Sequence, residues 1–155
     1  MNSGTERSHK MNRLETLAPD VAEKLRQAPP DKQRAVALVA CEFAIAQANL
    51  QRASIEEACK GLRKGTGLSP AQQSEIEALV ASLDNEYFDL QEAAEEGRAT
   101  TDDYLRKFAQ ARAVSTLLFA SKSNPLEAST EAVYEAAAVM NDRGPLFSAV
   151  ESALR

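Results

Sequence analysis

The stretch AVALVACEFAIAQA, residues 35–48, holds a single charged side chain, Glu42, in a run that is otherwise almost wholly apolar. At 100° per residue, Val36, Val39, Phe43 and the following Leu50 form one large apolar stripe, and Leu38 and Ile45 lie nearly opposite. A face of small residues lies between them: Ala37, Cys41, Ala44 and Ala48. A helix that is apolar over so much of its circumference belongs at the centre of a bundle. We therefore expect residues 31–49 to form a central helix that neighbouring helices approach closely.

Glu42 falls in the remaining polar sector of this helix, and no Lys or Arg stands three or four residues away to pair with it. On the helix predicted over residues 100–121, Arg112 lies within an aromatic stripe. Desolvating either charge alone costs several kcal/mol. We therefore expect Glu42 and Arg112 to form a structural ion pair between two central helices. The alternative, in which each side chain reaches solvent separately, stays open.

Helix signals punctuate the whole chain. Ser54 with Glu57, Ser69 with Gln72, and Thr100 with Asp103 are capping patterns, with Thr101 as an alternative to Thr100. Prolines and glycines separate the segments between them. The predicted helices are 19–27, 31–49, 54–65, 69–97, 100–121 and 124–141, with a short one after Gly144-Pro145. No window alternates apolar and polar residues over the length of a strand. The sequence therefore predicts an all-α bundle of about six to seven helices, with stacked helical hairpins as an open alternative.

Length and composition bound the organisation of the chain. Its 155 residues fit one domain, and its aromatic content of 5% with no Trp indicates a core of Ala, Leu and Val. We expect a disordered leader over residues 1–12 and one helical domain over residues 13–155. Cys41 and Cys59 show no metal or redox spacing, and no apolar run is long enough to span a membrane. These features predict a cytoplasmic protein with reduced thiols and no membrane contact.

The acidic charge is concentrated in one segment. The chain carries a net charge of −5, and the stretch from Gly65 to Gly97 contains no Lys or Arg at all. Eight carboxylates lie in that stretch: Glu75, Glu77, Asp84, Glu86, Asp89, Glu92, Glu95 and Glu96. Such a segment solubilises a long helix or complements a basic partner.

Phe88 is the unusual residue of this acidic segment. The core stripe of its helix consists of Ile76, Leu79, Val80, Leu83, Tyr87 and Leu90. Phe88 lies off that stripe, beside Glu77, Asp84, Glu92 and Glu95. One interpretation is that a neighbouring segment covers Phe88 and the acids only solubilise the helix. The other is a partner-binding surface, in which an aromatic anchor is ringed by carboxylates.

A second acidic row follows in the helix predicted over residues 124–141. Glu127, Glu131 and Glu135 are spaced at i, i+4 and i+8, where like charges repel weakly. A solvated helix face is the simpler interpretation. If this row lay on the same side as the acidic segment, the two would present a broad negative field to a basic protein.

Catalytic signatures are weak or missing in the sequence. The only histidine is His9, and there is no Gly-rich phosphate motif, so we expect no catalytic residue and no cofactor. The pair Glu92 and Glu95 resembles a carboxylate pair of all-α, magnesium-dependent nucleotide pyrophosphohydrolases. No basic residue lies in that segment to hold phosphates, so we expect no metal site and keep the hydrolase as an alternative. The acidic charge also disfavours nucleic-acid binding.

Four segments carry a family resemblance: QRAVALVACEFAIAQA (33–48), SIEEACKGLRKG (54–65), YLRKFAQARAVSTLLFA (104–120) and EAVYEAAAVM (131–140). Together they resemble the alanine-rich helical immunity proteins that bacteria encode beside secreted toxins. The shared features are alanine-rich helix faces, an Ala-Cys pair and a helix that ends in Arg-Lys-Gly. The resemblance implies an inhibitor that binds a cognate toxin, and it assigns no functional residue.

These observations favour a protein-binding module without enzymatic activity, either an immunity protein or an antitoxin. We expect the acidic helix face around Phe88 to cover the basic surface of a partner, such as a toxin. A structural homodimer is a further alternative, completed through the acidic helix or through the last helix with Leu146, Phe147 and Val150.

Overall fold

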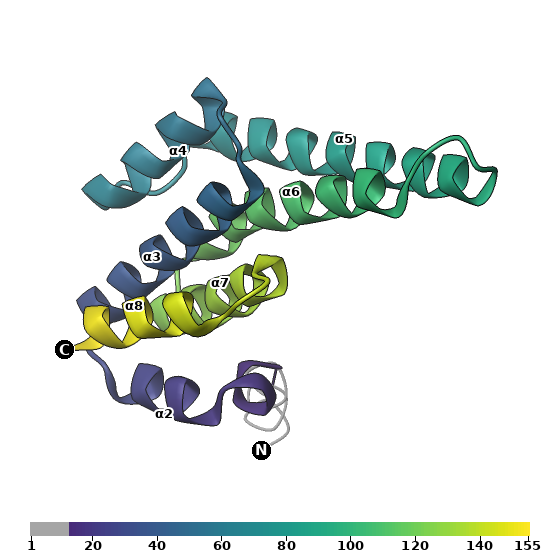
Figure 1. Cartoon of the computed structure of the whole chain (residues 1–155). Coiled ribbons are helices and arrows are strands. Elements are labelled where there is room, and N and C mark those ends of the chain that lie inside the picture. Colours follow the sequence, from purple (N-terminus) through teal and green to yellow (C-terminus); the bar gives the residue numbers. More distant parts are fainter. Residues whose placement is uncertain (1–12) are drawn as a thin grey trace, which may run out of the picture.

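Helix α3 (Pro30–Ala48) lies at the centre of the computed structural model, which describes residues 13–155 (Figure 1). Its buried side chains are mostly small, and Ala40, Cys41 and Ala44 are fully inaccessible to solvent. Small side chains let neighbouring helices approach closely, and α3 packs against α6, α7 and α8. The predicted central helix is therefore confirmed, and Asn49 ends it in a left-handed conformation with φ of 56°.

The described residues are entirely helical apart from turns and connections, so the predicted all-α class is confirmed. The remaining helices are α2 (Pro19–Gln27), α4 (Ala53–Lys64), α5 (Pro70–Glu95), α6 (Thr101–Ala120), α7 (Pro125–Val139) and α8 (Gly144–Leu154). A short helical turn over residues 13–17 precedes α2, which brings the number of helices to eight, one above the predicted range. The extra turn forms because Leu14 is buried in the core. The predicted leader, residues 1–12, lies outside the described residues.

Helix α7 is the second buried helix of the bundle. Ala128, Ala132, Val133 and Ala136 are inaccessible to solvent, and α7 packs against both α3 and α6. Its N-terminus is capped by the side chain of Asn124, which accepts a hydrogen bond from the backbone N–H of Glu127. The C-terminal helix α8 then covers α3 with Leu146 and Val150, so these two residues belong to the core of a single copy.

Helices α5 and α6 form a long antiparallel hairpin, here called the α5–α6 arm, that projects beyond the other helices (Figure 1). Two of the three predicted capping boxes are present, with Ser69 and Gln72 at the start of α5 and Thr100 and Asp103 at the start of α6. The C-terminal half of α6, residues 111–120, carries the buried side chains of this helix and lies in the core of the bundle. From residue 84 to residue 110, however, no side chain is fully buried. We call residues 84–110 the far half of the arm. It is a pair of helices that the rest of the bundle does not fully cover.

One predicted capping box is wrong. Helix α4 begins at Ala53, one residue before Ser54, and its N-cap residue Arg52 makes no side-chain capping bond. Ser54 thus lies inside the first turn, and Glu57 pairs with Lys60 instead. The end of α4 does follow the prediction, because Gly65 adopts φ of 80° and closes the helix.

Candidate functional site

The predicted ion pair between Glu42 and Arg112 is wrong. Glu42 pairs with Arg63 of α4, with 3.0 Å between Oε2 and Nη2. Arg112 pairs with Glu135 of α7, its Nη1 lying 2.8 Å and 3.0 Å from the two carboxylate oxygens. The polar sector of α3 that carries Glu42 faces α4, so its partner comes from that helix and not from α6.

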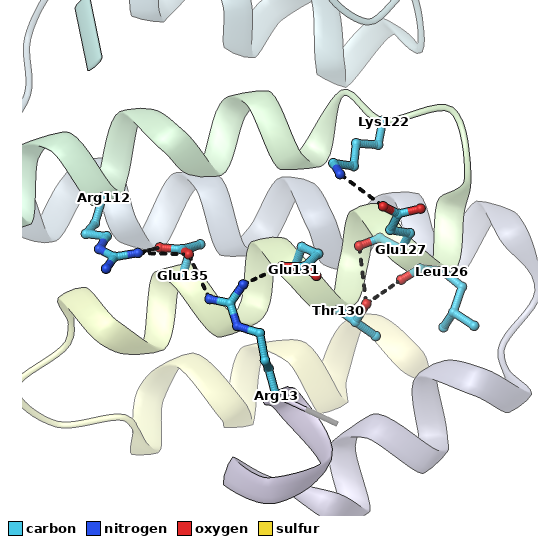
Figure 2. A network of polar contacts seen from close by, with 8 residues as sticks. All are labelled: Arg13, Arg112, Lys122, Leu126, Glu127, Thr130, Glu131 and Glu135. Atoms are coloured by element: carbon cyan, nitrogen blue, oxygen red, sulfur yellow. Dashed lines mark hydrogen bonds and ion pairs between the residues drawn. The ribbon is translucent and has the colours of Figure 1, made fainter. Parts of the chain in front are cut away.

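A network of polar contacts that joins α6, α7 and the turn at residues 13–17 surrounds Glu135 (Figure 2). Glu135 is only 2% exposed and accepts hydrogen bonds from Arg112 and, at 3.0 Å, from Arg13. Arg13 also bonds Glu131 at 3.1 Å and lies 4.1 Å above the ring of Tyr134. Burial alone would lower the pKa of Arg13, but the hydrogen bond to Glu135 and the charge of Glu131 outweigh it and raise that pKa.

The predicted solvated acidic row on α7 is therefore wrong. Glu127, the first member of the row, pairs with Lys122 at 2.9 Å, so each of the three carboxylates has a cationic partner (Figure 2). The row faces the end of α6 and the turn at residues 13–17. Because its charges are compensated within the chain, α7 adds no broad negative field to that of α5.

Phe88 is exposed on the far half of the α5–α6 arm. Its exposed fraction is 61%, and the only other large apolar side chain of the described residues in the exposed class is Leu105, at 47%. The Phe88 ring contacts Tyr87 at a centroid distance of 5.1 Å. Tyr87 in turn contacts Tyr104 at 5.9 Å and Phe108 at 5.6 Å. A chain of aromatic rings therefore runs across the arm and ends in the exposed ring of Phe88.

The carboxylates that share the face of α5 with Phe88 are all exposed: Glu77, Asp84, Glu92 and Glu95. None of them has a hydrogen-bonding or ionic partner among residues 13–155, whereas Glu86, on another side of α5, pairs with Lys107 of α6 at 3.4 Å. We call Phe88 and these four carboxylates the α5 acidic face. It combines an exposed aromatic ring with uncompensated negative charge.

A small pocket opens beside Phe88, between the two helices of the arm. Its volume is about 350 Å³. The residues that line it are Asp84, Tyr87 and Phe88 from α5, and Phe108, Ala111, Arg112 and Ser115 from α6. We call it the α5–α6 notch. The contribution of α6 was missed in the sequence, although the aromatic stripe with Arg112 was visible there, because one helix does not show which neighbour its stripe will face.

A larger groove lies between α3 and α4, with a volume of about 480 Å³. Glu42 and Arg63 both line it and pair with each other, and Glu56 and Lys60 add one charge of each sign. This groove therefore shows no preference for a ligand of either charge.

The two cysteines belong to the packed core of the bundle. Cys41 and Cys59 are free and buried. Desolvation raises the pKa of Cys41 to about 12 and also raises the pKa of Cys59, so both thiols stay protonated at neutral pH. Over residues 13–155, no three His, Cys, Asp or Glu side chains gather in a way that could hold a metal ion. The hydrolase alternative thus rests on sequence spacing alone.

In the part of the chain that the structure describes, no helix is both long enough and apolar enough to cross a membrane. Comparison of the chain with protein-family models, with curated proteins and with solved structures gives no match.

Proposed function

We propose that this protein is a binding module that holds a basic protein partner against the α5 acidic face. The observation that carries the proposal is the exposed ring of Phe88 among four carboxylates that no cation compensates within the described residues. Aromatic anchors surrounded by polar groups are typical of the residues that dominate binding energy at interfaces. Uncompensated charge of one sign speeds the encounter with a partner of opposite charge.

The shape of the arm supports the same proposal. Because no side chain of residues 84–110 is fully buried, Phe88 keeps apolar area on the α5 acidic face that a partner would cover. The resemblance to immunity proteins suggests the biological class of partner, a toxin whose basic active-site surface is occluded. A cytoplasmic location belongs to this proposal, because an immunity protein protects the cell that makes the toxin and both buried thiols are free.

The test is capture of a partner from lysate of the source cells, followed by calorimetry with the purified partner. The triple variant Phe88→Ala/Asp84→Lys/Glu92→Lys removes the anchor and reverses two charges of the face. We expect it to weaken binding by at least about 30-fold, since an interface hot spot contributes about 2 kcal/mol or more. Wild-type affinity should also fall as the salt concentration rises.

A matched control variant is Leu105→Ala/Glu56→Lys/Glu75→Lys. It removes the other exposed apolar side chain and makes the same change in net charge, but leaves the α5 acidic face intact. We expect it to bind the partner as tightly as the wild type does. Equal affinity of the triple variant and this control would contradict the proposed surface. Equal helicity of all three proteins by circular dichroism shows that neither variant acts by unfolding.

A further inference from the structure

The α5–α6 notch has the size of a receptor for one side chain. Its volume of about 350 Å³ lies at the small end of ligand pockets, which span roughly 300–1,000 Å³. It opens directly beside the exposed ring of Phe88, so a partner lying on the α5 acidic face would cover its mouth. The inference below rests on the proposed function and concerns the group that enters this notch.

The charges that line the notch favour a cation. Arg112 is the only basic residue in the lining, and its Nη1 is engaged by both oxygens of Glu135. Glu135 and Glu131 together balance Arg112 and Arg13, so that network adds no net charge. The carboxylate of Asp84 has no partner among the described residues and is therefore the uncompensated charge of the notch.

The rings and the hydroxyl favour a planar cation over a point charge. The guanidinium carbon of Arg112 already lies 5.0 Å from the centroid of the Phe108 ring, which shows that a guanidinium fits against the aromatic wall of the arm. The ring of Phe88 is exposed and free to stack with a second one. Ser115 donates its hydroxyl hydrogen to the carbonyl of Ala111, so its oxygen retains lone pairs that accept an N–H.

We propose that the α5–α6 notch receives an arginine side chain of the basic partner. Asp84 accepts hydrogen bonds from the guanidinium, Phe88 stacks on its face, and Ser115 accepts a further N–H. Arginine fits better than lysine because its planar fork meets a carboxylate through two parallel bonds and stacks on aromatic rings, whereas an ammonium is a strongly hydrated point charge.

Nuclear magnetic resonance of the ¹⁵N-labelled full chain tests this proposal with small probes. The probes are N-acetyl-arginine methylamide, its lysine counterpart, and its citrulline counterpart, which has nearly the shape of arginine without the charge. We expect the arginine probe to shift the amide signals of the notch residues, and to bind about threefold to fivefold more tightly than the other two, because Asp84 is exposed to solvent. Equal binding of the arginine and citrulline probes would overturn the proposal.

Two pairs of variants assign the binding to this notch. Asp84→Asn should weaken the arginine probe about threefold to fivefold, whereas Asp89→Asn, an exposed carboxylate of α5 outside the notch, should not. Phe88→Ala should weaken it, whereas Leu105→Ala should not. Wild-type binding by Asp84→Asn and Phe88→Ala would place the probe elsewhere and overturn the assignment.

Other occupants of the notch give different results. If the notch signals move with protein concentration in the absence of probe, a second copy occupies the notch. If Arg7→Gln/Lys10→Gln moves the same signals, the N-terminal segment of the chain itself occupies it. Either result overturns the proposal of a partner arginine. Failure of the probe while a basic partner still binds the α5 acidic face would reject this inference alone. Probe binding without any such partner would reject the proposed function alone.

Discussion

The single buried carboxylate of Glu135 pairs with two arginines from different parts of the chain. It joins Arg112 of α6 and Arg13 of the first helical turn to α7. We expect Glu135→Gln to lower the free energy of unfolding by about 2 to 3 kcal/mol, because hydrogen bonds to charged groups are the strong ones, Arg112 loses its carboxylate partner and Arg13 keeps only Glu131. Glu131→Gln should cost less than about 1 kcal/mol, because Arg13 keeps Glu135. Urea unfolding measures both, and equal losses would contradict the central role of Glu135.

The buried thiol of Cys41 should make the stability of the fold depend on pH in alkaline solution. Desolvation raises its pKa in the folded protein to about 12, above the ordinary value of 9.0 for an unfolded thiol. A group whose folded pKa is raised contributes its full stability below the unfolded pKa and loses it as the pH rises through the folded pKa. Stability should therefore fall between about pH 9 and about pH 12. Part of this fall should disappear in Cys41→Ala, compared by urea unfolding across that range; an unchanged slope would contradict the assignment.

Single residues were predictable where a local rule fixes their place. The position of Phe88 off the core stripe follows from the helical angle, and the structure exposes it. The partners of Glu42 and Arg112 were not predictable. An ion pair depends on which helix lies opposite, and the choice of α4 over α6 for Glu42 is made by the packing of the whole bundle.

The starts of the helices depend on local capping bonds, and substitution of the capping residues tests this dependence. Ser69 and Thr100 cap α5 and α6 with their side chains, whereas Ser54 does not cap α4. Replacement of Ser69 or Thr100 by Ala should cost about 1 kcal/mol of stability, and Ser54→Ala should cost little. Thermal or urea unfolding compares the three variants. A comparable loss in Ser54→Ala would mean that α4 begins as the sequence pattern predicts.

The cap of α6 also responds to acid. The backbone N–H of Thr100 donates to the carboxylate of Asp103, and this bond, with that of the Thr100 side chain, lowers the pKa of Asp103. A lowered folded pKa contributes stability that is present above the unfolded pKa and lost as the pH falls through the folded pKa. Titration of the Asp103 carboxyl by nuclear magnetic resonance should show the lowered pKa. Thr100→Ala keeps the backbone N–H and removes only the side-chain bond, so it should move the pKa part of the way back toward the ordinary value of 3.8; an unmoved value would contradict the contribution of the Thr100 side chain.

Replacement of Gly61 in α4 by alanine should have the opposite of its usual effect on helix stability. Replacement by Ala normally stabilises a helix by roughly 1 kcal/mol. Here a Cβ atom at Gly61 would overlap the backbone carbonyl of Gly67, which folds back over the end of α4. We therefore expect Gly61→Ala to destabilise the protein by about 1 to 3 kcal/mol, as overpacking does. Urea unfolding would measure this loss, and a gain in stability would show that the loop yields easily.

More of the architecture than of the candidate site could be predicted from the sequence. The alanine-rich pattern of residues 35–48 and the spacing of caps and glycines predict an all-α bundle around α3, because these signals are local and repeated. The α5–α6 arm was not predictable as a projecting hairpin. Its apolar stripe resembles that of any core helix, and only the packing shows that α5 lies mainly against α6 and that Tyr87 and Leu90 stay partly exposed. The α5–α6 notch, built by two helices, was invisible for the same reason.

The uneven burial of the chain predicts uneven local stability. No side chain from residue 84 to residue 110 is fully buried, whereas α3 and α7 are packed on several sides. Since regions with few buried contacts open at lower free energy, amides of residues 84–110 should exchange with solvent faster than those of α7 by about 100-fold or more.

Native-state hydrogen exchange measures this difference. Thr100→Ala removes the cap at the far end of the arm and should speed exchange in residues 84–110 without changing α7, which serves as the internal control. A bound basic partner should slow exchange in residues 84–110 selectively, because it would bury the surface that the free chain leaves open. One common exchange rate for α7 and the arm would instead show that the hairpin unfolds only with the bundle, and the arm would then be a rigid surface that pays no ordering cost when a partner binds.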